Sequence, residues 1–268
     1  MSFPVESVIS ARETHAETED QRYPIGFGAI GEDGMRRFHY AHIHASAAST
    51  MKGYAVHSSD TLEQYAVAGA TVAVGDMTIT ANAHASYDVV ANQFANGLMT
   101  ANTGSKYWYS VKSNTACSAA ATYTVELNEP MLEGVTTSEY LNFAANPFAN
   151  VFAPKYGIGT GTVYQHYGGF LGLPMLDFTA DYYGWIQTWG PCAEQMVHFL
   201  GASANEHELY FNIDGSVIGA RGPDVGEGSW DGTTGGFQRA GFIYPMTYYG
   251  SAGQDNVGPL VFCLTIMP

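Results

Sequence analysis

The chain has 268 residues, of which 46% are hydrophobic and 13% charged, and its formal net charge is −15. A chain of this length forms one large β domain or two smaller ones and buries a core without disulfides. The excess of acids argues against nucleic-acid binding and against adhesion to anionic lipid, because both need Lys and Arg. The charged fraction is about half the usual ~25%, which leaves a surface of small polar and aromatic residues suited to packing against other protein.

Residues 1–34 differ from the rest of the chain. "ARETHAETEDQR" is charged and polar without a lasting apolar face, and "YPIGFGAIGEDG" adds Pro and four glycines. We expect an extended N-terminal arm, which is either an ordinary frayed terminus or a segment that becomes ordered on a neighbouring subunit. "MSFPVESVIS" has no basic region and no long apolar run, so we expect no signal peptide. No apolar stretch approaches the ~20 residues that cross a bilayer.

A first β module is predicted over residues 35–130. "MRRFHYAHIHAS" alternates like a strand, with one face made of Phe38, Tyr40, His42 and His44. "TVAVGDMTITANA" predicts two short strands about a Gly75-Asp76 turn, and "DVVANQFANGLM" is either a short helix or a turn before a strand. "SKYWYSVKS" and "ATYTVELNEP" are strands rich in aromatic and β-branched residues.

A connector is predicted over 131–160 and a second β module over 161–268. The connector region, from Pro130 on, has three prolines and no sustained period. In the second module, "LGLPMLDFTADYYGWIQTWGPCAEQMVHF" predicts two or three strands, "HELYFNIDGSVIGARG" a hairpin about Asp214-Gly215, and "GPLVFCLTIMP" a closing strand. The expected fold class is therefore mainly β: two β-sandwich or barrel-like modules, an extended N-terminal arm and few short helices.

Aromatic residues are concentrated in "DYYGWIQTWGPC", residues 181–192. On a strand, one face carries Tyr183, Trp185, Gln187 and Trp189. Such a row forms either a packing surface, in the core or at an interface, or a platform on which a carbohydrate stacks. We expect packing, because Gln187 is the only polar side chain on that face. The candidate packing or interface residues are Tyr183, Trp185, Trp189, Trp108, Phe38 and Tyr40.

No residue set satisfies the requirements of a catalytic or metal site. His42 and His44 share a strand face, but a zinc site needs further ligands at matching spacing, and none is evident. The acids of the second half (Asp177, Asp181, Glu206, Glu208, Asp214, Asp224, Glu227 and Asp231) include turn and glycine-loop residues, so turn chemistry explains them better than a glycosidase pair or a calcium loop. "GIGTG" at 157–161 precedes no helix and is a loop. We expect no enzyme activity, no cofactor and no metal.

The three cysteines, Cys117, Cys192 and Cys263, are odd in number, form no CxxC and stand among apolar or small residues. We expect buried free thiols.

Three stretches carry a resemblance. They are "GEDGMRRFHYAHIHAS…KGY", "ANQFANGLMTANTGSKYWYSVKSNTA…TYTVELNEPM", and "DYYGWIQTWGPCA" followed by "DGSVIGA" and "GPLVFCLTIMP". In this order the chain, from about residue 26 to 268, resembles virion structural proteins of tailed bacteriophages of aquatic bacteria. The most specific segments are "YWYSVK…VELNEP" and "YGWIQTWGP". These are patterns of packing and carry no functional residues over.

The resemblance implies a head decoration, or cement, protein that binds the outer face of the capsid and reinforces it. The implied partners are the major capsid protein and further copies of the chain, as a trimer or a dimer, with no nucleic acid and no membrane. The implied location is the capsid exterior of the virion, after synthesis in the host cytoplasm. Two alternatives stay open: a tail, neck or head-fibre component, and a carbohydrate-binding spike domain with Trp185, Trp189 or Trp230 exposed in a groove.

Overall fold

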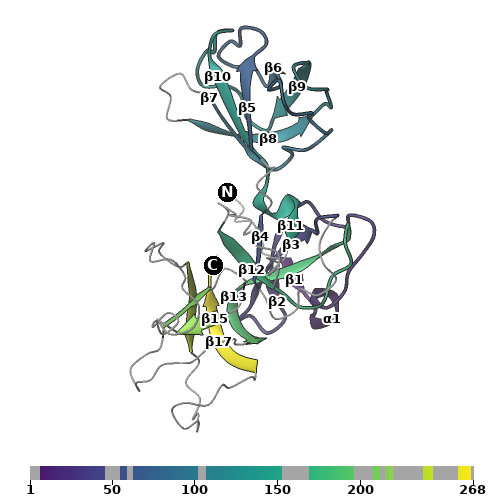
Figure 1. Cartoon of the computed structure of the whole chain (residues 1–268), viewed down its shortest axis with the longest axis vertical. Coiled ribbons are helices and arrows are strands. Elements are labelled where there is room, and N and C mark those ends of the chain that lie inside the picture. The colour runs from purple at the N-terminus through teal and green to yellow at the C-terminus, as the bar shows by residue number, and fades with distance from the viewer. Residues whose placement is uncertain are drawn as a thin grey trace, which may run out of the picture. The chain divides into compact units, whose positions relative to one another are not determined.

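The computed structural model describes residues 7–45, 55–58, 63–101, 107–152, 169–195, 208–211, 215, 217–219, 238–243 and 259–266. Within these ranges regular structure is nearly all β, and the helical elements are the four-residue α1 (Ala11–Thr14) and the 3-10 turn η2 (Pro147–Ala149) (Figure 1). The expectation of a mainly β fold with few short helices is confirmed.

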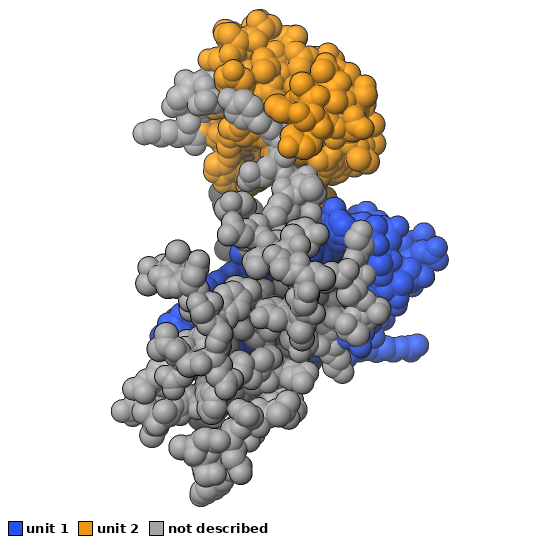
Figure 2. All heavy atoms as spheres, viewed as in Figure 1, with its two compact units in different colours: residues 1–23, 27–58, 150–268 blue, residues 24–26, 59–149 orange. Residues whose placement is uncertain are grey.

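The chain forms two compact units, coloured separately in Figure 2. The first, which we call the sheet unit, combines residues 1–23, 27–58 and 150–268; the second, the barrel unit, combines 24–26 and 59–149. This corrects the predicted division at 34, 130 and 160. Strand pairing between distant segments, which local composition does not encode, decides the boundaries.

Six antiparallel strands close the barrel in the order β10-β5-β6-β9-β8-β7 (Figure 1). They are β5 (Glu63–Ala68), β6 (Thr78–Asn82), β7 (Leu98–Ala101), β8 (Trp108–Asn114), β9 (Thr122–Leu127) and β10 (Tyr140–Ala144). Alternation along each strand directs one set of side chains inward, as in the buried Tyr109 and Val111 of β8. The predicted strands 105–113 and 121–130 correspond to β8 and β9, whereas β10 lies inside the predicted connector.

The inside of the barrel is filled by aromatic and aliphatic side chains. Phe143 stacks on Phe94, with ring centroids 5.2 Å apart, and its ring lies 5.9 Å from that of Tyr123. Phe94 belongs to the segment that precedes β7, which forms turns, so the turn interpretation of "DVVANQFANGLM" is confirmed and the short helix is wrong. The buried Asn114 amide holds this segment: its Oδ1 accepts from Phe94 N at 2.9 Å and its Nδ2 donates to Val90 O at 2.9 Å.

The sheet unit is built on the strand path β1-β2-β3-β13-β17-β16-β14-β15. These strands are β1 (Ser7–Ile9), β2 (Gly28–Gly31), β3 (Arg37–His42), β13 (Tyr183–Gln195), β17 (Pro259–Thr265), β16 (Arg239–Ile243), β14 (Glu208–Phe211) and β15 (Val217–Gly219). Three further strands, β4 (Val56–Ser58), β11 (Val151–Phe152) and β12 (Phe170–Pro174), pair off this path. β14 and β15 form the predicted hairpin, with Phe211 opposite Val217 and Gly215 at a φ of 82°.

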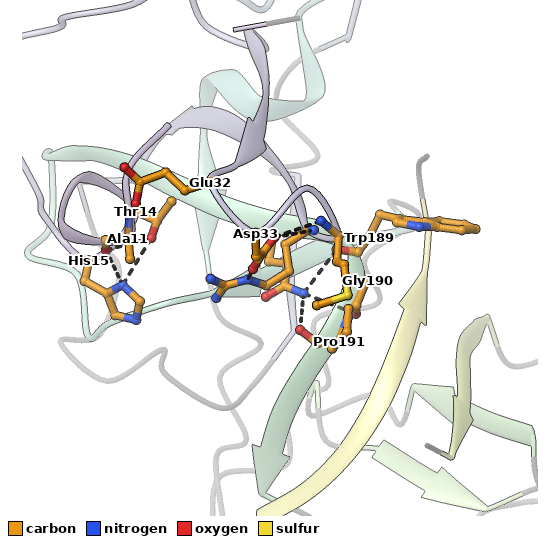
Figure 3. Close-up of polar contacts among 11 residues, drawn as sticks. Ala11, Thr14, His15, Glu32, Asp33, Trp189, Gly190 and Pro191 are labelled. Carbon is orange, nitrogen blue, oxygen red and sulfur yellow. Dashed lines mark hydrogen bonds and ion pairs between the residues drawn. The ribbon is translucent and has the colours of Figure 1, made fainter. Parts of the chain in front are cut away.

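The central strand β13 changes partners along its length. Its first half pairs with β3 and its second half, from Trp189 on, pairs with β17. A bulge between Gln187 and Trp189 and a positive φ of 92° at Gly190 redirect the strand between the two pairings. The buried Gln187 side chain secures the bend, since its Nε2 donates to the carbonyls of Trp189, Gly190 and Pro191 (Figure 3).

Over the described residues 7–34, the N-terminal region contributes two strands to the sheet, so the expectation of an extended arm is wrong there. β1 pairs in parallel with β2, and Ser10 caps α1 by accepting a hydrogen bond from Glu13 N. The β2–β3 turn is closed by Asp33, whose Oδ1 accepts from Met35 N at 2.8 Å and whose Oδ2 forms an ion pair with Arg36 (Figure 3). Polar caps and turns therefore explain the charge that suggested an arm.

Two further expectations need correction. The "TVAVGDMTITANA" segment contains one strand, β6, because Val72 forms only an isolated bridge with Val135. The predicted connector, 131–160, contains β10, η2 and β11, all of which pack into one unit or the other. The glycine-rich stretch "GEGSWDGTTGGFQRAGF", residues 226–242, which the sequence indicates to be a loop, lies largely outside the described residues, and its last five residues fall in or next to β16.

Candidate interaction surfaces

An aromatic cluster covers one face of the β3–β13 pair. The register places Tyr40 opposite Trp185 and His42 opposite Tyr183, so these side chains share a face. Tyr23, from the segment before β2, lies over them, with its ring centroid 5.2 Å from both Tyr40 and Trp185. The rings meet edge-on or tilted, the arrangement that aromatic pairs prefer.

The structure brings Phe38, Tyr40 and Trp185 together in this buried layer and leaves Tyr183 half-buried beside it. Trp189 does not share their face. The bulge places Trp189 opposite Arg37, whose side chain points to the other side of β3 from that of Phe38. Its ring points away from the Asp33 turn (Figure 3). The predicted common face of 183, 185, 187 and 189 is therefore wrong for Trp189, because strict alternation fails at a bulge.

A cavity of about 10 Å³ lies beside the aromatic cluster, lined by Glu13, Ala16, Thr18, Arg22, Tyr23, Tyr40 and Trp185. This volume holds about one water molecule. The chain itself satisfies the ring hydroxyls: Tyr40 OH accepts from Arg22 N at 3.2 Å, and Tyr23 OH donates to Glu13. This hydrogen bond, together with burial, raises the pKa of Tyr23. Trp185 is only 2% exposed, so a sugar cannot stack on it; Trp230 lies outside the described residues.

The histidines of β3 are engaged in packing contacts. His42 Nε2 lies 3.1 Å from Asp181 Oδ1, and the His42 ring lies 4.6 Å from Tyr183. His39, on the other face, lies 3.1 Å from Thr188 Oγ1, and burial followed by the charge of Arg37 lowers its pKa. Over the part of the chain that the structure describes, no three His, Cys, Asp or Glu side chains gather in a way that could hold a metal ion.

Three of the acids considered from the sequence, Asp177, Asp181 and Glu208, lie among the described residues. Asp181 sits at a φ of 65° in the left-handed region and faces His42, while Glu208 contacts Arg239 at 3.4 Å. Asp177 is exposed. The other candidates, Glu206, Asp214, Asp224, Glu227 and Asp231, lie outside the described residues.

The three cysteines are free, as expected, but half-buried rather than fully buried. Cys117 and Cys192 each lie 3.6 Å from a backbone carbonyl oxygen, of Ala121 and Phe262 respectively. Burial raises the pKa of the Cys117 and Cys263 thiols. A raised pKa keeps a thiol protonated and weakly reactive at neutral pH.

The candidate residue that remains well exposed is Trp108, on the outer wall of the barrel, with 64% of its surface exposed. Sequence reasoning missed most of the other exposed apolar side chains of the barrel, including Val74, Met77 and Leu132. They lie in turns, where no alternation of apolar and polar residues indicates which side chains are exposed. An apolar residue in a turn next to glycine or an acid is the one signal that could have found them.

No helix of the described segments is long and apolar enough to cross a membrane. No family model matches the chain, and comparisons with curated proteins and with solved structures return no significant match.

Proposed function

We propose that this chain is a non-enzymatic capsid decoration protein of a tailed bacteriophage, which binds the outer surface of the head and stabilises it. The resemblance of three stretches to phage virion proteins motivates the proposal. Its partners would be the major capsid protein and further copies of the chain, and its place the exterior of the virion. The same resemblance covers tail, neck and head-fibre proteins, so copy number and position on the particle are the quantities to measure.

The observation that carries the proposal is the distribution of exposed apolar side chains. Of the twelve large hydrophobic side chains that are exposed among the described residues, nine belong to the barrel unit: Val74, Met77, Tyr87, Val90, Leu98, Tyr107, Trp108, Leu132 and Tyr140. Residues 59–149 hold only ten charged residues, eight acids and two lysines. A rigid β surface with many apolar groups and few charges suits a permanent contact with protein.

The physics of a capsid lattice suits such a surface. Each contact can be weak, because an oligomer that engages several lattice positions at once binds far more tightly than one subunit. The net charge of −15 keeps free copies soluble and away from packaged DNA.

The test is the composition of purified virions. We expect the chain at a copy number comparable to that of the major capsid protein, in density on the outside of the shell. A few copies at one vertex would move the assignment to a tail, neck or fibre component. Absence from the particle would end the proposal.

A further inference from the structure

The two ends of the barrel differ in what they connect to. Ala144 pairs with Glu63 at one end, where the chain enters β5 and leaves β10, so both connections to the rest of the chain lie there. Tyr140 pairs with Val67 toward the opposite end. Because all six strands are antiparallel, the 69–77 and 128–139 segments and the start of β8 also belong to this opposite end. We call it the free end.

The free end is rich in exposed apolar side chains. Val74 is 67% exposed, Leu132 59% and Met77 47%, and Trp108 stands at the start of β8. Tyr107 and Tyr140 are exposed at the same end. These six residues form what we call the free-end patch. Among the described residues, the connected end has three exposed side chains of this kind, Tyr87, Val90 and Leu98.

Backbone hydrogen bonds hold the free-end patch in place. Gly75 N donates to Met131 O, and Met131 N donates to Asp76 O, both at 2.8 Å, so the 69–77 turn is joined to the 128–139 segment. Val72 and Val135 bridge the same two segments. Leu132 N donates to the hydroxyl of the buried Tyr109, 3.2 Å away.

The inner side chains of the 128–139 segment, Met131 and Val135, are buried in the barrel core. Its outer residue, Leu132, is thereby presented to solvent on a fixed backbone. A preorganised apolar surface loses little conformational entropy when it binds.

The described charged residues nearest the free-end patch are acidic. Asp76 and Glu129 are exposed, and Glu139 is half-buried. Each also fixes a turn: Asp76 accepts from Ala73 N, Glu129 from Ser110 N and Glu139 from Thr136 N. The described cation of this unit, Lys112, lies further along β8 and pairs with Glu126 at 3.2 Å.

We propose that the free-end patch is the docking surface of this chain for the major capsid protein, and that it binds an apolar area on that protein bordered by Lys or Arg side chains. The inference rests on the proposed function, which supplies the partner. Charge complementarity selects the basic border, because acids around an apolar centre attract cations at the rim of an interface. A second copy of the same end would bring acids against acids, so self-association through this surface is disfavoured.

The experiment measures binding of the fluorescently labelled full chain to phage heads purified from particles that lack it. A free-end variant, Trp108→Ser with Leu132→Ser, is compared with a connected-end control, Tyr87→Ser with Val90→Ser. Both replace two exposed apolar side chains of the same barrel. We expect the free-end variant to bind at least about tenfold more weakly, as for central residues of an interface, and the control to bind within about twofold of the original chain. Equal thermal midpoints show that both variants are folded.

A second variant tests the acidic border without disturbing the turns. Glu129→Gln with Glu139→Gln removes two charges but keeps the carbonyl oxygens that accept from Ser110 N and Thr136 N. We expect weaker binding and a smaller loss of affinity when salt rises from about 50 to about 500 mM, because rim charges are screened by salt.

The outcomes separate this inference from the proposed function. If the original chain does not bind heads, the proposed function fails. If it binds and the connected-end control is the variant that loses affinity, the docking surface is misplaced while the decoration role stands. If the free-end variant and the connected-end control both bind heads normally, but only the free-end variant fails to form oligomers in analytical ultracentrifugation, the patch is a contact between copies of this chain. That result overturns the proposal.

Discussion

Two tryptophans on similar strands, one in each unit, differ sharply in solvent exposure. Trp185 of β13 is 2% exposed and lies beneath Tyr23 and beside Tyr40, whereas Trp108 of β8 is 64% exposed. Both stand in aromatic, alternating segments. The difference shows that the number of covered faces, rather than the local pattern, determines whether an aromatic strand residue becomes core or surface.

The sheet unit covers both faces of its central strand. On one face of β13 the aromatic cluster lies over Trp185; on the other, a Cβ at Gly184 would meet the Phe178 ring at 1.9 Å. A barrel strand has a single inner face, which in β8 is taken by Tyr109 and Val111. The outer aromatic residues of the barrel are therefore left to solvent or to a partner.

The largest effect expected from this comparison is that of truncating the two tryptophans. Trp185→Ala removes a buried ring and leaves a cavity, so it should lower the free energy of unfolding by about 3–5 kcal/mol. Trp108→Ala should change it by no more than about 0.5 kcal/mol, because the indole is mostly in water already. Urea unfolding followed by circular dichroism measures both, and equal losses would remove the contrast between the units.

Two buried amides provide the next comparison. Asn114→Leu in the barrel leaves the buried Phe94 N without its acceptor and removes the hydrogen bonds donated to Val90 O and Thr115 O, so it should cost about 3 kcal/mol. Gln187→Met in the sheet unit loses the bonds from Nε2 to three carbonyls but also removes Gln187 Oε1, a buried oxygen without a hydrogen-bond partner. The second effect offsets part of the first, so the expected cost is about 1 kcal/mol. Chemical denaturation measures the loss of unfolding free energy in each variant. A larger loss for Gln187→Met than for Asn114→Leu would contradict this ranking.

Added methyl groups test how tightly β13 is covered. Gly184→Ala forces the Phe178 ring to move and should cost about 2 kcal/mol, as overpacking does. Gly75→Ala, in a barrel turn, meets nothing within 4 Å but has a φ of 95°, so it should cost only about 1 kcal/mol of backbone strain. Thermal unfolding in parallel compares them. Equal stability of Gly184→Ala and the original chain would show that Phe178 yields easily.

The smallest expected effect depends on pH. Burial lowers the pKa of His39 below its ordinary 6.5. As the pH falls, the His39 imidazole is therefore protonated at a higher pH in the unfolded chain than in the folded chain. The contribution of His39 to stability is therefore present above pH 6.5 and is lost as the pH falls from 6.5 toward the lowered pKa. His39→Gln should flatten this part of the stability profile. Unfolding measured between pH 5 and 8, with an NMR titration of the ring, checks it; a His39 pKa above 6.5 would contradict the sign.

Local sequence predicted most strands because alternation and β-branched or aromatic residues act within a few neighbours. The segments around Phe38, Trp108, Tyr123 and Trp185 were all identified in this way, as was the hairpin at Gly215. Local sequence does not predict a strand whose formation depends on a distant partner. β10 lies in the predicted connector and β1 in the predicted arm, because each is a strand only through its hydrogen bonds to a distant segment: β10 to β5 and β7, and β1 to β2.

For the candidate interaction residues, too, the sequence determines some properties and the tertiary structure decides the others. Sequence alone established that aromatic residues line the strands around 38–40, 108 and 183–189, and that the chain is acidic and poor in charge. Only the tertiary structure decided that Trp185 is enclosed, that a bulge turns Trp189 to another face, and that apolar turn residues gather at one end of a closed barrel. Burial and neighbourhood arise from contacts between segments far apart in the chain, and no local pattern encodes which of those contacts form.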